Sequence, residues 1–224
     1  MENRHGLTFQ SAYTWSHNIG IAPGGGGDFN QISNPFDRSF DRGPTGLDRR
    51  HILSLNYIYQ IPIFRDNKGP AGSLLGGWEF SGITLIQSGV PLTPTLNYDN
   101  IGLGGGATAR PDVVSSLNYP GTIDAWFNTA AFAKPAPLSF GSAGEGIIVS
   151  PGRANFNWSL FKSFRMPFPS HPEGAHLQFR VEAFNIFNHT QFYNVDTGFG
   201  SSTFGKITST HDPRVLQLGL KFLF

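Results

Sequence analysis

Seven histidines are the side chains best suited to metal binding or general acid–base work, but no pair has the HExxH spacing of a helical metal site. They stand at positions 5, 17, 51, 171, 176, 189 and 211. His17, His189 and His211 border expected loops, where they could bind a metal chelate or serve as ordinary polar loop residues. The chain has no cysteine, which excludes disulfides, thiolate metal sites and a cysteine nucleophile. We therefore expect no metal site.

A run of mixed charges lies between residues 37 and 50. Its carboxylates could act in acid–base catalysis or bind calcium. The spacing fits no EF-hand loop, however, and each aspartate has an arginine beside it, so we expect salt links within the run. Its members are Asp37, Asp41 and Asp48 with Arg38, Arg42, Arg49 and Arg50.

A glycine motif at residues 102–107 matches the GxGxxA fingerprint of dinucleotide-binding folds. That fingerprint requires a helix to begin at the glycines, and the Arg110-Pro111 pair that follows opposes one. The chain also lacks a GxSxG elbow and a P-loop. We therefore expect no catalytic residue, no enzymatic activity and no cofactor.

The elements that must position these residues are six segments in which apolar and polar side chains alternate with the period of a β-strand. Five of the six have 10–12 residues, close to the ~9–11 with which a tilted strand crosses a bilayer, and all are longer than the ~5–6 residues of a typical strand in a soluble sheet. The third segment loses its alternation at residues 83–86, which predicts a bulge. The segments are 6–17, 50–61, 77–93, 155–166, 176–187 and 215–224.

The composition agrees with a β-rich chain that has long loops. The 224 residues include 28 glycines, 16 prolines and 21 phenylalanines, which excludes a helical bundle. Charged residues make up 14%, against about 25% in a typical soluble domain. The net charge of +1 is too balanced for a nucleic-acid-binding protein. No apolar run reaches the ~20 residues of a transmembrane helix.

The links between the segments alternate between long and shorter, as in outer-membrane barrels with long external loops and short periplasmic turns. They span 18–49, 62–76, 94–154, 167–175 and 188–214. The fold class we expect is all-β, an antiparallel transmembrane β-barrel segment of about six long strands with long external loops. Its localisation would be the bacterial outer membrane, with membrane lipid as one partner.

Alternation also assigns faces to the charged residues within the strands. Glu79, Arg180, Glu182 and Lys221 fall opposite the apolar side chains, so we expect them to line the barrel lumen, where they would contact a solute or form an ion-pair ladder. Lys162 does not fit this pattern, because alternation places it on the same face as the apolar Trp158 and Leu160. Either it reaches the membrane interface from the lipid side, or a bulge turns it inward.

Five motifs, in order along the chain, resemble TonB-dependent receptors of the Oar-like type that carries a carboxypeptidase-regulatory domain. The last strand is also similar to the insertion signal read by the barrel assembly machinery, through Leu218, Leu220, Phe222 and Phe224. The motifs are DRRHILSLNYIYQIP at 48–62, GGWEFSGI with QSGVPLT at 76–93, WFNTAAF at 126–132, NWSLFKSF at 157–164 and RVEAFNIFNHTQF at 180–192.

The resemblance implies a protein that imports a scarce solute, such as a siderophore-like chelate or an oligosaccharide, with energy transmitted by the TonB complex. Members of this family have a signal peptide, a TonB box, a plug domain and about 22 strands. We find none of the N-terminal parts, and six strands are fewer than the ~8 of the smallest barrels. We therefore expect residues 1–224 to be a single C-terminal segment of a receptor barrel, whose partners include the missing N-terminal barrel and plug.

Two alternatives remain open at this point. The first is a surface or adhesin-type barrel in the outer membrane that does not transport. The second is a soluble β-sandwich binding module or glycosidase, which requires the apolar faces of the segments to pack on one another in a sealed core.

Overall fold

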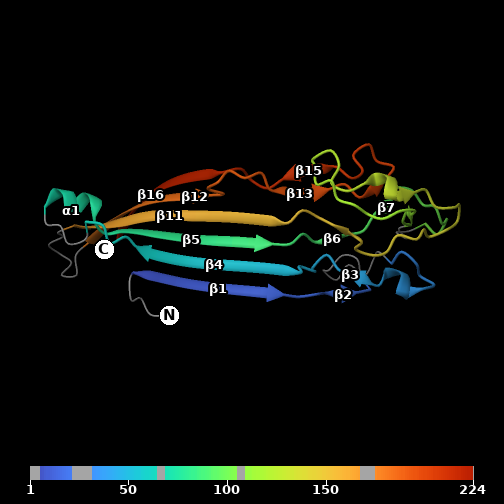
Figure 1. The fold of residues 1–224 in the computed structure, drawn as a ribbon, viewed down its shortest axis with the longest axis horizontal. Coiled ribbons are helices and arrows are strands. Elements are labelled where there is room, and N and C mark those ends of the chain that lie inside the picture. The colour runs from blue at the N-terminus through green and yellow to red at the C-terminus, as the bar shows by residue number, and fades with distance from the viewer. Residues whose placement is uncertain (1–5, 22–31, 65–68, 105–108, 167–174, 224) are drawn as a thin grey trace.

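The computed structural model describes residues 6–21, 32–64, 69–104, 109–166 and 175–223. Within them lies one large antiparallel sheet of six strands in the order β1-β4-β5-β11-β12-β16, with β1 and β16 as its edges (Figure 1). Its strands are β1 (Leu7–Trp15), β4 (His51–Gln60), β5 (Trp78–Gln87), β11 (Arg153–Met166), β12 (Ala175–Phe184) and β16 (Val215–Leu223).

Each segment with strand periodicity coincides with one of these strands, although β11 and β12 begin two residues and one residue before their segments. With ten residues, β4 has a length typical of a tilted strand that crosses a bilayer, for which ~9–11 residues are needed. The expected bulge at residues 83–86 is wrong, because β5 pairs with β4 and β11 without a break in register. The alternation fades there because Ile83 and Leu85 occupy the otherwise polar face while Thr84, 3% exposed, occupies the apolar one.

The register sorts the side chains of the sheet into two faces. Residues paired across the strands share a face, so Leu55, Thr84, Phe156 and their neighbours form one continuous surface. We call this the apolar face. It carries a row of aromatic rings in which Phe80 lies 5.5 Å from Trp158 and 5.8 Å from Tyr57. The opposite surface, which includes Asn56 and Ser159, is the polar face.

The three long links gather at one end of the sheet, and we call them together the loop cap (Figure 1). The cap consists of the described parts of residues 16–50, 88–152 and 185–214. Its first link contains β2 (Ile19–Gly20), η1 (Arg38–Asp41) and β3 (Gly43–Pro44). The second contains β6 (Pro91–Leu92), β7 (Thr95–Leu96), β8 (Asp112–Val113), η2 (Thr129–Ala131), β9 (Phe132–Ala133) and β10 (Ile148–Val149). The third contains β13 (Phe192–Val195), β14 (Gly198–Phe199) and β15 (Ile207–Thr210).

The cap has a hydrophobic core of its own. Phe127, fully buried, packs edge-on against Phe204 at 5.3 Å and Phe132 at 5.7 Å. Strand β14 of the third link pairs in parallel with β7 of the second, which joins the two links directly. Every buried member of this core among the described residues comes from the cap: Phe127, Ala131, Phe132, Ala143, Ile148, Val195 and Ile207.

The opposite end of the sheet carries the link between β4 and β5, with the short helix α1 (Pro70–Leu75) (Figure 1). Among the described residues, no helix has the length and apolar character needed to cross a membrane.

Candidate functional site: the loop cap and the polar face

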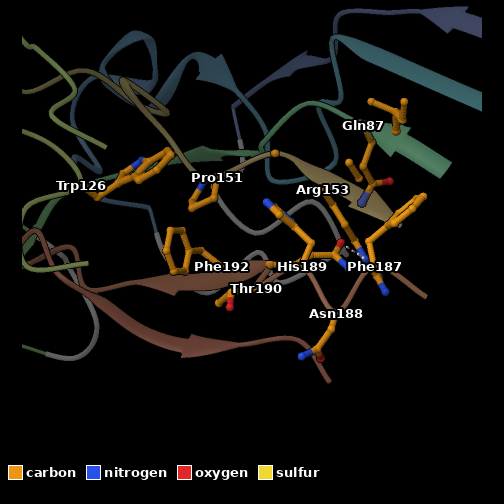
Figure 2. A pocket seen from close by; sticks show the side chains of 13 residues that line it. Gln87, Trp126, Pro151, Arg153, Phe187, Asn188, His189, Thr190 and Phe192 are labelled. Atoms are coloured by element: carbon orange, nitrogen blue, oxygen red, sulfur yellow. Dashed lines mark hydrogen bonds between the residues drawn. The ribbon is translucent and has the colours of Figure 1, made fainter. Parts of the chain in front are cut away.

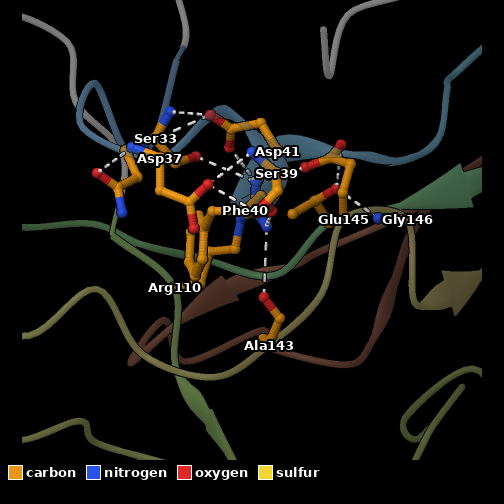
Figure 3. A network of polar contacts seen from close by, with 11 residues as sticks. Ser33, Asp37, Ser39, Phe40, Asp41, Arg110, Ala143, Glu145 and Gly146 are labelled. Carbon is orange, nitrogen blue, oxygen red and sulfur yellow. Dashed lines mark hydrogen bonds and ion pairs between the residues drawn. The ribbon is translucent and has the colours of Figure 1, made fainter. Parts of the chain in front are cut away.

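A buried ionic cluster joins the first and second links of the cap. Arg110, whose side chain is 1% exposed, donates through Nη2 to Asp41 Oδ1 at 2.6 Å and to Glu145 Oε2 at 2.7 Å (Figure 3). Its Nη1 donates to the carbonyl oxygen of Phe40 at 3.0 Å, and its guanidinium lies 4.5 Å from the centre of the Phe40 ring. These contacts span 69 residues of sequence between Asp41 and Arg110, so the cluster fixes one link on the other.

Both carboxylates have further donors, as buried charges require. The backbone N–H of Ser33 donates to Asp41 Oδ2 at 2.9 Å, and the Thr93 hydroxyl donates to Glu145 Oε1 at 2.6 Å. Burial raises the pKa of Glu145 despite the opposing effects of the Thr93 hydrogen bond and the Arg110 charge. Burial lowers the pKa of Arg110, while Glu145 and Asp41 oppose that change.

The expectation of salt links within the 37–50 run is right for Asp48 and wrong for Asp41. Asp48 accepts from Arg50 Nε at 3.1 Å and contacts His17 Nδ1 at 3.1 Å. Burial opposes ionisation of Asp48, but the Asn18 N–H, His17 and Arg50 together hold its pKa below the usual value. Asp41 instead pairs with Arg110, because the cap folds the second link over the first.

Asp37 takes a local role in the same run. Its carboxylate accepts from the N–H of Ser39 at 2.9 Å, which caps η1. The run therefore organises the first link through three separate arrangements and forms neither a calcium loop nor a carboxylate pair.

The glycine motif forms a turn around Asp99. The carboxylate of Asp99 accepts from the N–H groups of Ile101, Gly102 and Gly104 at 2.8 to 2.9 Å. These bonds hold the pKa of Asp99 below its usual value. No helix begins at Gly102 or Gly104, and residues 105–108 lie outside the described part of the chain.

A cavity of about 790 Å³ opens where the cap meets the sheet (Figure 2). Its walls come from the cap-side ends of β5 and β11 and from residues 187–192, and include the rings of Trp126, Phe187 and Phe192. Arg153, the first residue of β11, also lines it and donates through Nε to Gln191 Oε1 at 3.3 Å. No residue in the lining is an aspartate or glutamate.

The histidines do not converge in the described part of the chain, which contains no group of three or more His, Cys, Asp or Glu side chains able to hold a metal ion. His17 contacts Asp48, His189 lines the cavity, and His211 lies 4.7 Å from the ring of Tyr193. His5 and His171 fall outside the described residues.

The four charged residues assigned to the lumen share the polar face. Arg180 pairs with Glu182 along β12 at 3.1 Å, and its guanidinium lies 5.6 Å from the centre of the Phe161 ring on β11. The register places Glu79 opposite Phe161, and Lys221 opposite Gln178. The Arg180–Glu182 pair is an ion pair within one strand, and the contact of these four residues with a solute or with one another across strands stays a prediction.

Lys162 lies on the apolar face, since β11 pairs with β5 and β12 without a break in register. Its ammonium group donates to the carbonyl of Gly76, the C-cap of α1, and lies 5.0 Å from the centre of the Phe164 ring. A cation at a helix C-terminus compensates free carbonyl groups. The unbroken register excludes a bulge at Lys162, so its side chain reaches along the apolar face.

A family model described as an outer membrane beta barrel domain matches residues 1–217. The chain belongs to this family. Its location is accordingly the bacterial outer membrane, as expected from the strand lengths and faces. No match was found among curated proteins or among solved structures.

Membership in the outer-membrane barrel family agrees with the way this chain buries its apolar residues. The soluble β-sandwich alternative requires a second layer on the apolar face, yet the buried core of the described residues lies in the cap. Side chains on that face remain open, with Leu218 72% exposed and Tyr13 62% exposed. The soluble alternative is therefore wrong.

Three of the four residues assigned to an assembly signal lie in β16, and their role as a signal stays a prediction. Leu218, Leu220 and Phe222 fall on the apolar face of β16, opposite Val181, Phe179 and Leu177 of β12. Phe224 lies outside the described residues.

Two residues of the ionic cluster, Arg110 and Glu145, escaped the sequence interpretation. The usable signal was weak: Glu145 is a lone charge within a glycine-rich stretch, and Arg110 has Asp112 two residues after it as an apparent local partner. A lone charge in such a stretch either faces solvent or has a distant partner, and periodicity cannot choose between these.

Proposed function

We propose that this chain is a wall segment of an outer-membrane TonB-dependent receptor that imports a scarce solute. The support is the ordered set of receptor-like motifs together with an outer-membrane barrel family match. Under this proposal the apolar face contacts lipid, the polar face lines the lumen, and the loop cap forms part of the external mouth.

The edges of the sheet support a wall segment within a larger barrel. Unpaired backbone groups cost several kcal/mol each in hydrocarbon, so β1 and β16 need further strands beside them in the membrane. Six strands do not suffice for the smallest closed barrels of ~8 strands. We propose that the rest of the receptor barrel, of about 22 strands in the resembling family, supplies them.

The remaining roles follow from this placement. Glu79, Arg180, Glu182 and Lys221 would contact the solute or the plug within the lumen. The barrel assembly machinery would recognise β16, and the TonB complex would act only through the plug. No residue of this chain is proposed to act in catalysis.

The observation that carries the proposal is the ordered set of receptor-like motifs along a chain of the outer-membrane barrel family. The test compares, in the native bacterium, cells that lack this gene with cells that lack TonB, by profiling the solutes left in the growth medium. We expect one solute class to remain unused in both strains and to disappear on complementation. A gene deletion that leaves solute uptake unchanged, in medium where TonB deletion impairs it, would refute import.

A second candidate is a surface or adhesin-type barrel, favoured by the self-contained hydrophobic core of the cap. It predicts that deletion of cap residues 115–140 abolishes attachment of cells to a surface while the sheet stays folded. Import predicts a loss of uptake with attachment unchanged.

A further inference from the structure

The cavity between the cap and the sheet has the dimensions and walls of a small-molecule site. Its volume of about 790 Å³ lies within the ~300–1,000 Å³ typical of ligand pockets. Phe187 is 59% exposed although its ring packs edge-on against Phe156 at 5.1 Å and Trp158 at 5.3 Å. The aromatic row of the sheet thus continues into the cavity as open apolar surface, together with Trp126 and Phe192 (Figure 2).

The charged group of the cavity is held in a fixed place. Gln191, 4% exposed, accepts from Arg153 and donates through Nε2 to Asn155 Oδ1 at 3.2 Å. Arg153 forms no ion pair with a carboxylate among the described residues. A guanidinium hydrogen-bonded through Nε to one neutral amide keeps its remaining N–H groups for an external acceptor.

The surroundings of Arg153 are also electropositive. His211, which follows β15, has its pKa lowered by burial and by the charges of Arg153 and Arg49, with only Asp212 opposing. Arg49 itself donates to the backbone carbonyl of Ser88 at 3.2 Å, at the end of β5. Arg153 and Arg49 therefore bring two positive charges close to His211, and Asp212 supplies one opposing charge there.

We propose that this cavity binds an organic anion, with the carboxylate or phosphate held by Arg153 and an apolar body packed on Trp126, Phe187 and Phe192. A neutral sugar would leave the positive charge uncompensated, and a cation would be repelled. Two sources carry this chemistry: a solute from the medium, or an anionic lipid of the surrounding membrane. Binding of an anion in this cavity does not require import, so the binding test and the import test are independent.

The test uses the full natural protein, purified from outer membranes in a non-ionic detergent, and calorimetric titration with matched probes. 2-Naphthoate and 2-naphthylmethanol share an aromatic body and differ in charge. Dilauroyl phosphatidylglycerol and dilauroyl phosphatidylcholine do the same for the lipid source. The variants are Arg153→Gln, Arg153→Lys, and Arg38→Gln as an exposed control in the first link.

Loss of one charge-assisted hydrogen bond corresponds to about a tenfold weaker affinity. We expect Arg153→Gln to weaken the anionic probe by about tenfold or more, Arg153→Lys to recover most of the affinity, and Arg38→Gln to match the parent. The neutral probe should change by less than about twofold. Heat-modifiable electrophoretic mobility confirms that each variant is folded.

The two sources give different patterns. If the protein binds 2-naphthoate more tightly than 2-naphthylmethanol but binds the two lipids equally, the site takes a solute. If it binds the phosphatidylglycerol more tightly than the phosphatidylcholine but binds the two naphthalene probes equally, the site takes a lipid. Equal affinity for charged and neutral members of both pairs in the parent protein, or an Arg153→Gln variant that binds as the parent does, would overturn the proposal.

Discussion

Replacing Arg110 with methionine should open the loop cap without unfolding the sheet. Methionine keeps much of the apolar stem but removes the only guanidinium within reach of two buried carboxylates among the described residues. Asp41 is 0% exposed and the side chain of Glu145 is 3% exposed, so water cannot replace the lost hydrogen bonds without local opening.

The size of the effect follows from the burial. Exposed ion pairs contribute about 0–1 kcal/mol, whereas removal of one partner from a buried pair costs about 3–5 kcal/mol because the other charge stays buried. The pair distances of 2.6 and 2.7 Å and the side-chain exposure of 1% place Arg110 in the second class. We therefore expect the free energy of cap opening to fall by about 3–5 kcal/mol.

The assay is amide hydrogen exchange of the natural protein in detergent, followed peptide by peptide. Cap peptides that include residues 33–41 and 143–146 should exchange about 100-fold faster or more at pH 7, since each 1.4 kcal/mol is a factor of ten. Peptides of β4 and β11 should exchange as in the parent protein. Arg38→Met is the matched control, because Arg38 is an exposed arginine of the cap in the first link, next to the segment that holds Asp41.

Two results would refute this reasoning. One is an Arg110→Met variant whose cap exchanges no faster than that of Arg38→Met. The other concerns rescue: adding Asp41→Asn and Glu145→Gln to Arg110→Met removes the uncompensated charge and should restore part of the protection. A triple variant that opens further than Arg110→Met would show that unpaired charge is not the cause.

Three other substitutions test individual interactions. The pKa of Glu145 is raised in the folded protein, so the cap of the parent protein should lose stability as the pH rises above 4.5 through that raised value. Glu145→Gln should remove this dependence of cap stability on pH, as measured by amide exchange at pH 5 and 8. The pKa of Asp48 is lowered in the folded protein, so Asp48→Asn should reduce the stability of the first link by about 1–3 kcal/mol at neutral pH. This difference in stability between the parent and the variant should shrink as the pH falls below 3.8, as measured by proteolysis of the first link. Lys162→Met should speed amide exchange at residues 70–77 through loss of the bond to Gly76, while Lys162→Arg should not; equal exchange in both would contradict the helix-capping role.

The strands and their faces were predictable because alternation is a local property. Leu53, Leu55 and Tyr57 differ from Ser54 and Asn56 in hydrophobicity at every step, and the register keeps that difference across the sheet. The failure at β5 has a local cause as well. Thr84 is on the apolar face, where its hydroxyl lies 3.4 Å from the Tyr57 hydroxyl, so a polar partner rather than a bulge accommodates it.

The loop cap was not predictable, because its contacts join residues far apart in the chain. Asp41 has arginines beside it in sequence, and nothing local indicates that Arg110 will be its partner. The close approach also depends on backbone geometry: Gly141 has φ +75°, and a side chain there would overlap the carbonyl of Arg110. Such constraints appear only once the links are packed together.

The orientation of the sheet in the membrane is the central claim, and a nitroxide scan along β4 tests it most directly. Residues 1–224 contain no cysteine, so once any cysteine elsewhere in the natural protein is replaced, single cysteines at residues 53 to 57 can each carry one spin label in lipid. We expect collisions with oxygen to be most frequent at 53, 55 and 57, and collisions with a water-soluble nickel complex to be most frequent at 54 and 56. Accessibility without this period of two, or with the opposite phase, would contradict it.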